Sequence, residues 1–486
     1  MKNITDLGIA KTARPIRVVQ FGEGNFLRAF VDYMIDILNE KNGFDGSIAI
    51  VKPISYGSLE RFQRQNCLYT VILRGQENGQ VVNDSRIVTS VDRAVDGADT
   101  WDNLAELAKC PTVRFVVSNT TEAGIVLDES DSMENVPATY PGKLTKFLYQ
   151  RFCAFSGSPE SGVILLPVEL IEDNGGKLKA CVLRLAQVWN LPAAFTEWLT
   201  EHCVFCSTLV DRIVTGYPAA EAEALWQQLG YRDELLDVGE PFGLWVIESD
   251  RDVSAELPLD KIGLPVIFTD NQKPYRERKV RILNGAHTSS VLAGWLYGKS
   301  IVRDMMQDEV TGAFVRQAVL EEIAPQVPLA RKDVDAFAAA VFERFENPFI
   351  DHALLSISLN SVSKWKSRVL PSLRDHFAQY GILPRRLTFS FAALLAFYSS
   401  DDLREDGLHA QRADGTEYTV LDDRAALEFF AENSRRPIAE FVDAAASRED
   451  FWGEDLHRYA GFTDAVTADL AALRENPKQA VADLVK

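Results

Sequence analysis

A lysine, an asparagine and a histidine are spaced closely enough in this sequence to act on one carbonyl group. They are Lys279, Asn284 and His287 in the segment KVRILNGAH. If this segment is α-helical, about 100° of rotation per residue places the three side chains within an arc of about 140°. A partly buried lysine whose pKa falls toward neutrality can carry a proton, and an asparagine can stabilise a developing alkoxide. The histidine could orient a hydroxyl or assist the same oxygen, so the three residues favour carbonyl chemistry.

A structural interpretation of the same three residues stays open. Lys279 lies in a run with three arginines that solvent could surround, and Asn284 with Gly285 could simply kink a helix. Polar residues near the start of a helix commonly bond to the local backbone. The spacing alone therefore does not decide between catalysis and structure.

A glycine-rich turn near the start of the chain could hold a nucleotide. The apolar run 16–21 is followed by Gly22-Glu23-Gly24-Asn25 and then by apolar residues at helical spacing. In such a strand–turn–helix unit, backbone N–H groups approach a pyrophosphate at the helix N-terminus. The third glycine of the usual fingerprint is absent, so an ordinary tight turn is the alternative. The candidate cofactor residues of this unit are Phe21, Gly22, Gly24, Asn25, Phe26 and Arg28.

Two further sites along the chain bear on the nucleotide. The fingerprint asks for an acid near the end of the second strand to bind the ribose 2′-hydroxyl, but Lys52 and Pro53 stand there, which by itself favours NADP. Asn119 and Thr120 follow a later apolar run, at the sheet edge where ligands bind, and we expect them to contact a ribose and the nicotinamide. A helix N-cap is the alternative for this second pair.

The hydrophobic pattern predicts two domains. Apolar runs at 16–21, 47–54, 113–124 and 162–171 are typical of a parallel sheet covered on both faces. The alternating stretches 68–75 and 85–95 indicate an antiparallel insertion. We therefore expect an α/β, Rossmann-like domain at 1–275 with a mostly parallel sheet. Beyond it, helical periodicity predicts an all-α domain at 276–486, with a polar surface loop at 401–424.

Composition excludes several classes of protein. The chain has 486 residues, 47% of them hydrophobic, and a formal net charge of −19, so we expect a globular protein that binds neither nucleic acid nor an anionic membrane. No run of about 18 apolar residues occurs, and we expect a cytoplasmic protein. Cys203 and Cys206 form a CxxC beside His202, but no second pair accompanies them, so we expect no metal site.

The KxxxxNxxH pattern at 279–287 and the early GxGNFxRAF motif together resemble the polyol-specific long-chain dehydrogenases, the mannitol dehydrogenase family. Further blocks between about residues 16 and 400 are similar to the branch that acts on keto-sugar acids: FGEGNFLRAFVDY, SNTTEAGI, STLVDRIVTGYP, KPYRERKVRILNGAHT and LNSVSKWKSRVLPSL. The resemblance implies metal-independent hydride transfer with NAD in a cleft between two domains. It implies that Lys279 is the general acid and base and that Asn284 stabilises the substrate oxyanion, with His287 beside them. It also implies that Asp211 tunes the electrostatic field in the cleft. A buried pair with Arg212 is the alternative for Asp211.

The sequence departs from this family at two places. The resemblance implies an asparagine at the position of Leu170 in mannitol-type members, so a second donor to the substrate oxygen is missing or comes from Asn174. Lys52 replaces the ribose-binding acid, yet the resemblance implies NAD and overrides the local argument for NADP.

A sugar-acid substrate needs a cation for its carboxylate. Lys364, Lys366 and Arg368 form a basic cluster in an acidic chain, and we expect Lys364 and Arg368 to bind the substrate; a solvated face is the alternative. The expected activity is thus NAD-linked reduction of a keto-sugar acid. A reductase for a different keto-uronate, a mannitol-type 2-dehydrogenase and a non-catalytic nucleotide-binding regulator are the alternatives. The oligomeric state stays open, with a monomer plausible.

Overall fold

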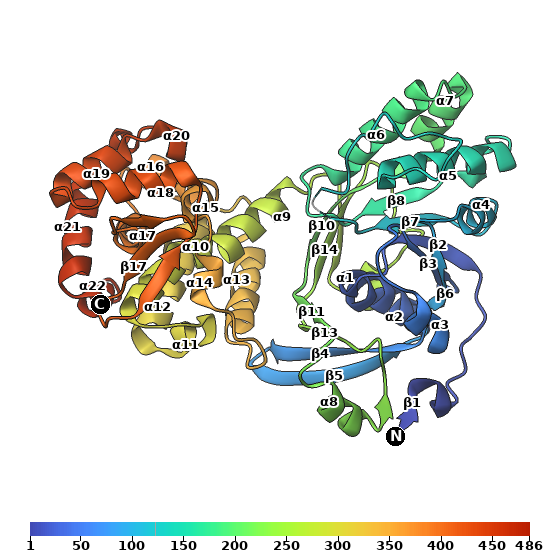
Figure 1. The fold of residues 1–486 in the computed structure, drawn as a ribbon, viewed down its shortest axis with the longest axis horizontal. Helices are drawn as coiled ribbons and strands as arrows, with labels where there is room; N and C mark the ends of the chain where they lie inside the picture. Colours follow the sequence, from blue (N-terminus) through green and yellow to red (C-terminus); the bar gives the residue numbers. More distant parts are fainter. Residues whose placement is uncertain (122) are drawn as a thin grey trace. The chain divides into compact units, whose positions relative to one another are not determined.

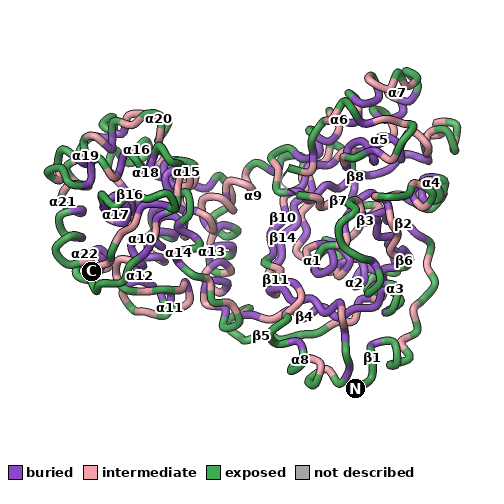
Figure 2. The backbone as a smooth tube through the Cα atoms, in the orientation of Figure 1, coloured by how far each residue is buried: buried purple, intermediate pink, exposed green. Residues whose placement is uncertain are grey.

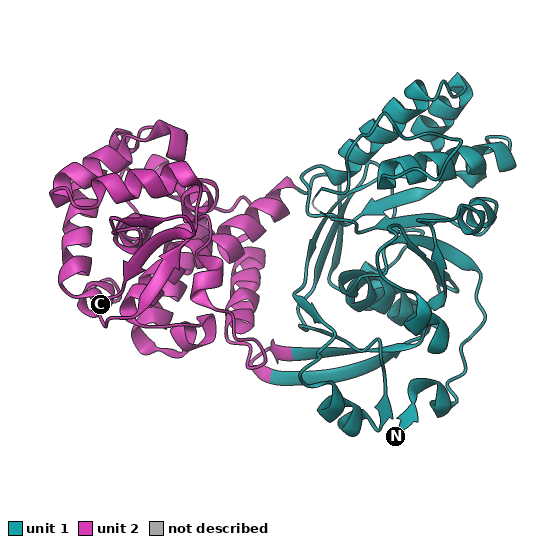
Figure 3. Ribbon diagram, in the orientation of Figure 1, with its two compact units in different colours: residues 1–74, 81–272 teal, residues 75–80, 273–486 magenta. Residues whose placement is uncertain are grey.

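The structure is a computed structural model that describes residues 1–121 and 123–486. The chain forms two compact units (Figure 3). Unit 1 comprises Met1–Arg74 and Val81–Gln272, and unit 2 comprises Gly75–Gln80 and Lys273–Lys486. The sequence predicted the division after residue 275 and did not predict that a short segment at 75–80 joins the second unit.

A six-stranded parallel sheet forms the centre of unit 1 (Figure 1). Its spatial order is β6 (Val91–Asp96), β3 (Ser47–Lys52), β2 (Ile16–Phe21), β7 (Phe115–Ser118), β8 (Ile164–Pro167) and β9 (Val204–Phe205). The chain builds the sheet outward from β2 on one side and then from β7 on the other. This order is that of the dinucleotide-binding doubly wound fold, which confirms the predicted Rossmann-like class.

Both faces of this sheet are buried, as Figure 2 shows along its central strands. Val18, Ile50 and Val117 belong to one apolar core, and their neighbours in sequence belong to another. The first core includes the helical run 25–42, and the second is closed by helices such as α5 (Tyr140–Ala154). The other helices of unit 1 are α1 (Asn25–Leu27), the π-helix η2 (Arg28–Asp32), α2 (Tyr33–Asn42), α3 (Glu60–Arg64), α4 (Asp102–Ala108), α6 (Asn174–Val188), α7 (Ala193–His202) and α8 (Ala222–Leu229).

The predicted insertion is only partly correct. The strands β4 (Tyr69–Glu77) and β5 (Gln80–Val88) form a hairpin, and a second sheet has the order β11-β13-β4-β5. Residues 91–96 instead pair in parallel with β3 as an edge strand, and this position explains their alternating polarity. The remaining strands are β1 (Lys2–Asn3), β10 (Ser207–Asp211), β11 (Val214–Gly216), β12 (Tyr231–Arg232), β13 (Asp237–Gly239), β14 (Leu244–Glu248) and β15 (Val266–Thr269).

Unit 2 is helical, as predicted, except for one small sheet. The polar segment expected to be a loop forms three antiparallel strands, β16 (Asp402–Arg404), β17 (Gly407–Gln411) and β18 (Glu417–Val420), so that prediction is wrong. The helices are α9 (Lys273–Arg278), η5 (Lys279–Asn284), α10 (Gly285–Tyr297), α11 (Val302–Gln307), α12 (Glu309–Gln317), η6 (Ala318–Ile323), α13 (Arg331–Phe345), α14 (Leu354–Ile357), α15 (Ser361–Arg368), α16 (Leu370–Tyr380), α17 (Arg385–Phe397), α18 (Arg424–Asn433), α19 (Ile438–Ala446), α20 (Glu449–Trp452), α21 (Phe462–Glu475) and α22 (Pro477–Ala482).

Helix α10 forms the centre of unit 2. It packs against α17, α14 and α15, and most of its residues are buried. A helix buried on all sides must satisfy its own polar groups. Thr288 Oγ1 accordingly donates to the Asn284 carbonyl at 2.9 Å, and Ser290 Oγ donates to the Ala286 carbonyl at 2.5 Å. These side chains therefore satisfy their hydrogen-bonding groups within the helix itself. Among the described residues, no helix is both long enough and apolar enough to cross a bilayer.

Two buried acids of unit 1 belong to, or pair with, the helical run that follows the glycine turn. Asp32 accepts a hydrogen bond from Tyr69 Oη at 2.7 Å, and Asp237 pairs with Arg28 at 3.5 Å. Burial raises the pKa of Asp32 to about 7 and that of Asp237 to about 6, although the Arg28 charge acts in the opposite direction on both. Folding thus keeps protons on groups that release them readily in the unfolded chain.

The raised pKa of Asp32 predicts a pH dependence of stability. Between about pH 4 and about pH 7 the folded protein binds more protons at this site than the unfolded chain does, so the free energy of unfolding falls as the pH rises. Asp32→Asn keeps a partner for Tyr69 and removes the titration. We expect it to flatten the decline between about pH 5 and 7 by up to about 1.4 kcal/mol per pH unit, measured by urea unfolding. The exposed Asp84→Asn is the control, and parallel curves for Asp32→Asn and the wild type would contradict the prediction.

Candidate functional site

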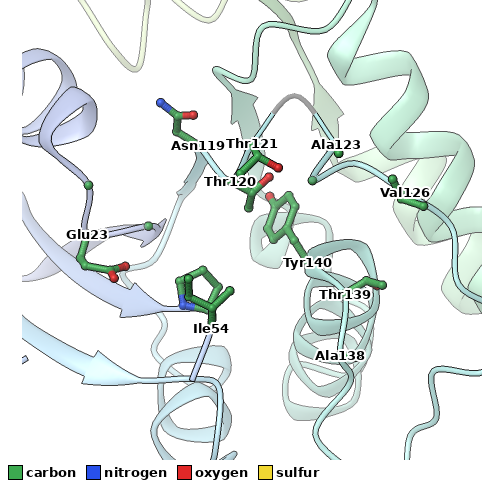
Figure 4. A pocket seen from close by; sticks show the side chains of 14 residues that line it. Glu23, Ile54, Asn119, Thr120, Thr121, Ala123, Val126, Ala138, Thr139 and Tyr140 are labelled. Atoms are coloured by element: carbon green, nitrogen blue, oxygen red, sulfur yellow. The ribbon is translucent and has the colours of Figure 1, made fainter. Parts of the chain in front are cut away.

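A cavity of about 400 Å³ opens at the carboxyl edge of the parallel sheet, between β2 and β7 (Figure 4). It is lined by the turn after β2, the loop after β3, the segment after β7 and the start of α5. Ligands of open α/β sheets bind at this edge, where the strand order reverses. The volume is also within the usual range of ligand pockets. The cavity is therefore the candidate nucleotide site.

The glycine turn fits the close approach that a dinucleotide requires. Gly22 has a φ of 124°, and a Cβ atom at this position would lie 3.0 Å from the carbonyl oxygen of Asn119. Any other residue would be strained and would press on the neighbouring strand end. Gly24 has open space around it, and the helical run begins directly after it. The backbone at this turn can therefore come close to a pyrophosphate.

The structure separates the predicted cofactor residues into two groups. Gly22, Gly24, Asn119 and Thr120 line the cavity. Phe21 does not line it, because its side chain is fully buried in the core and packs on Tyr140 with ring centroids 5.1 Å apart.

Asn25, Phe26 and Arg28 also lie outside the cavity lining. Phe26 stacks on Phe30 with centroids 4.9 Å apart. The Arg28 guanidinium donates to the Leu235 carbonyl at 2.5 Å and to Asn25 Oδ1. For Arg28 and Asn25 the structure therefore indicates a role in holding the helix to the core, in place of the predicted cofactor contact.

Glu169 is a site residue that the sequence did not reveal. It is 2% exposed, and its carboxylate accepts hydrogen bonds from Ser118 Oγ and from both N and Oγ1 of Thr120, each at 3.1 Å. Burial raises the pKa of Glu169, while these donors act in the opposite direction. Glu169 follows β8 and fixes the segment after β7, so only the pairing of these strands could have identified it.

Lys52 does not have the environment of a phosphate-binding lysine. Its ammonium donates to the Ile54 carbonyl at 2.7 Å and lies 3.4 Å from the carboxylate of Asp96 on β6. The side chain is 7% exposed. The charge of Lys52 is thus partly neutralised inside unit 1, which removes the local argument for NADP.

In unit 2, the segment that carries Lys279 and Asn284 is a π-helix, in contrast to the expected α-helix. The N–H of Gly285 donates to the carbonyl of Val280, five residues back, and α10 begins at Gly285. Since a π-turn closes over five residues, Lys279 and Asn284 return to the same side of the helix. His287 follows Asn284 by three residues in α10 and shares that side.

His287 lies in an aromatic environment. Its ring stacks on Phe345 with centroids 4.1 Å apart and lies edge-on to His352 at 5.5 Å. Its Nδ1 atom is buried and has no hydrogen-bond partner among the described residues. Burial, followed by His352 and then by nearby positive charges, holds the pKa of His287 well below its ordinary value. The ring is therefore neutral at physiological pH.

The positive charges around His287 come from Arg344, Lys364 and Arg368. Lys364 and Arg368 are four residues apart on α15, so they share one face of that helix. The carbonyl of Arg368 lies 3.1 Å from where a Cβ atom of Gly285 would be, so α15 packs directly on the start of α10. The structure thus brings the two predicted substrate cations to the predicted catalytic histidine, and it adds Arg344, which the sequence did not reveal.

The two cations on α15 are half-buried, and the nearby charge of Asp422 acts on Lys364. Lys364 Nζ donates to the Ile357 carbonyl at 3.0 Å, and in the described part of the chain neither Lys364 nor Arg368 forms an ion pair. Burial lowers the pKa of both groups. By contrast, Lys366 is exposed and lies beside Gly453. The arrangement can bind an anion next to a neutral imidazole.

Other predicted residues take different places. Asp211 ends β10 and is 7% exposed, and Arg212 beside it donates to the carbonyls of Ala29 and Phe242.

The Asn174 amide is fully buried; it donates to three backbone carbonyls at 3.0 Å each and accepts from Thr208 N. These contacts use the hydrogen-bonding capacity of Asn174 within the protein, which favours a structural role over substrate binding. Leu170 is 62% exposed.

Comparison with known proteins agrees with this geometry. The family model described as the mannitol dehydrogenase Rossmann domain matches residues 16–261, and the model of the mannitol dehydrogenase C-terminal domain matches residues 271–474. The chain belongs to the mannitol dehydrogenase family. Membership confirms the expectation of an oxidoreductase. No group of three or more metal-binding side chains is found among the described residues.

Curated relatives match nearly the whole chain. An altronate oxidoreductase of Pectobacterium carotovorum is 44% identical over 478 residues, which cover 96% of each chain. The altronate oxidoreductase of Escherichia coli O7:K1 is 43% identical over 483 residues, 98% of each chain.

Solved structures share the fold. Mannitol 2-dehydrogenase of Pseudomonas fluorescens, in complex with NAD and D-mannitol, has a TM-score of 0.67 at 23% identity and covers 100% of this chain and 96% of its own. A D-sorbitol dehydrogenase in substrate-free form has a TM-score of 0.77 at 20% identity, covering 99% and 100%.

The contacts of Glu169 predict its importance for the nucleotide site. Glu169→Ala leaves the buried Ser118 hydroxyl and Thr120 N–H without their acceptor, which costs about 1–3 kcal/mol. We expect lower thermal stability and weaker dinucleotide binding, measured by calorimetry and by titration of cofactor fluorescence. Glu172→Ala, an exposed acid on the same connection, is the control. Unchanged binding in Glu169→Ala would contradict the prediction.

Proposed function

We propose that this chain catalyses the reversible, NAD-linked reduction of D-tagaturonate to D-altronate. The observation that carries the proposal is the π-turn that brings Lys279 and Asn284 to one side of the helix, a side that His287 shares three residues after Asn284. Lys364 and Arg368, which form no ion pair among the described residues, lie near this histidine. The altronate oxidoreductases at 43–44% identity support the choice of sugar acid. Unit 1 supplies the nucleotide site and unit 2 supplies the groups that act on the substrate.

The nucleotide site fits NAD on this chain's own geometry. The backbone of the glycine turn can approach a pyrophosphate, because Gly22 has no side chain to press on Asn119 and Gly24 has open space beside the cavity. Gly22, Gly24, Asn119 and Thr120 would hold the cofactor. When bound, the nicotinamide supplies or accepts a hydride. No residue is needed for metal binding in this scheme.

The residues of unit 2 take distinct roles in the proposed reaction. Lys279 protonates the substrate oxygen in reduction and removes that proton in oxidation. Asn284 donates a hydrogen bond to the same oxygen as negative charge develops. Because the buried Nδ1 of His287 has no partner, leaving it as an acceptor costs less than burying an unpaired N–H, so its proton lies on Nε2. That N–H can orient a substrate hydroxyl.

The substrate carboxylate has a natural partner on α15. Arg368 can bind it through two parallel N–H groups, and Lys364 adds a second charge from one turn earlier. Arg344 strengthens the positive field at this position. In a chain of net charge −19, such a field attracts an acid only locally. The cations therefore support a sugar acid over a neutral polyol as the substrate.

Removal of the lysine amine tests the proposed chemistry. We expect Lys279→Ala to lower kcat by a factor of about 100 to 10,000, as loss of a general acid does, with NADH affinity nearly unchanged. Steady-state kinetics and NADH titration measure the two effects. Lys332→Ala, an exposed lysine on α13, is the control. A non-catalytic nucleotide-binding protein would show no turnover to lose in the wild type, and retained turnover in Lys279→Ala would contradict the assignment.

Substrate charge tests the carboxylate site. We expect Arg368→Met and Lys364→Met each to raise KM for tagaturonate by about tenfold or more, because a charge-assisted hydrogen bond is lost. D-Fructose, which lacks the carboxylate, should be affected much less. Lys366→Met, on the same helix but exposed, is the matched control. Equal effects on the acid and the neutral ketose would exclude this role, and a panel that includes D-fructuronate separates the nearest alternative substrate.

A further inference from the structure

The ribose-binding acid of a Rossmann fold normally follows the second strand of the sheet. In this chain that strand is β3, which ends at Lys52, and the side chain of Lys52 is directed into contacts with Asp96 and the Ile54 carbonyl. The end of β3 therefore offers neither a carboxylate for a ribose nor an available ammonium for a 2′-phosphate. Another residue must determine which dinucleotide binds.

Glu23 is a carboxylate at the correct place in the cavity. It is the middle residue of the turn Gly22-Glu23-Gly24, and it lines the cavity. Figure 4 shows its side chain extending from the glycine turn toward Ile54, in the loop after β3. The position of a Cβ atom on Gly57 in the same loop lies 3.9 Å from Glu23 Oε1. The acid thus reaches from β2 to the loop where an acid after β3 would stand.

The surroundings of Glu23 act on its pKa in both directions. Glu23 is half-buried, and burial raises its pKa, while its own backbone N–H and the charges of Lys52 and Arg28 act in the opposite direction. Lys52, which pairs with Asp96 and does not line the cavity, thus favours the charged form of Glu23.

We propose that Glu23 binds the adenosine ribose hydroxyls of NAD and excludes the 2′-phosphate of NADP, in place of the acid that usually follows the second strand. A carboxylate accepts hydrogen bonds from both hydroxyls of a vicinal diol. The same carboxylate repels a phosphate at that carbon and leaves it without a donor. This inference rests on the proposed use of a nicotinamide dinucleotide.

Equilibrium binding tests the inference without turnover. The dissociation constants of NADH and NADPH are measured by fluorescence titration at fixed ionic strength for the wild type, Glu23→Gln and Glu23→Arg. We expect the ratio of the NADPH constant to the NADH constant to fall by about tenfold or more in Glu23→Gln and further in Glu23→Arg. Adenosine 2′,5′-bisphosphate and 5′-AMP, compared by calorimetry, should show the same change, because they differ only at the 2′ position.

The control is Glu60→Gln, an exposed acid on α3 that pairs with Arg64. It should leave the ratio unchanged within about twofold, which corresponds to less than about 0.5 kcal/mol. A wild-type chain that binds NADH, together with an unchanged ratio in both Glu23 variants, would overturn this inference alone. A folded wild-type chain that binds neither dinucleotide would overturn the proposed function as well.

Discussion

The backbone hydrogen bond from Gly285 N–H to the Val280 carbonyl determines the geometry on which the proposed substrate chemistry depends. It closes a turn of five residues, so the side chains of Lys279 and Asn284 return to one side of the helix. In a regular α-helix the same pair would diverge by about 140°. The turn is maintained because the residues after it are packed on all sides in α10, while Gly285 leaves room for the Arg368 carbonyl of α15. A rare local conformation is thus imposed by the core of unit 2.

The charge distribution of unit 2 follows from the same packing. The contact at Gly285 brings the face of α15 that carries Lys364 and Arg368 close to His287. Burial makes protonation of His287 unfavourable, and His352 and the three nearby cations act in the same direction, so the positive charge at this place belongs to the lysine and the arginines. In the proposed reaction the histidine would act as a neutral donor. Lys364 and Arg368 are half-buried and form no ion pair among the described residues, which is costly for folding. An anionic substrate that neutralises them would recover part of that cost on binding.

The sequence predicted the parts of the fold that depend on local pattern. Apolar runs gave β2, β3, β7 and β8, and the glycine turn gave the strand–helix unit at the sheet's centre. The partners of alternating strands could not be obtained in this way, since residues 91–96 have the same local pattern whether they extend the hairpin or form the edge of the parallel sheet. The strands at 402–420 were missed because their polar, exposed residues resemble a loop. In both cases long-range pairing decided between structures that local propensity leaves nearly equal.

The candidate sites show the same division between local and distant information. Spacing along one segment proposed Lys279, Asn284 and His287 as candidates, and charge patterning proposed Lys364 and Arg368. Glu169 and Arg344 were missed because each reaches its site from an element that is distant in sequence. The argument from Lys52 failed for a related reason: a fingerprint specifies a position along the chain, whereas a ribose requires a carboxylate at a position in space. Since the turn after β2 and the loop after β3 meet at the same sheet edge, the same place can be reached from either strand, and the side chain of Lys52 can turn away toward β6.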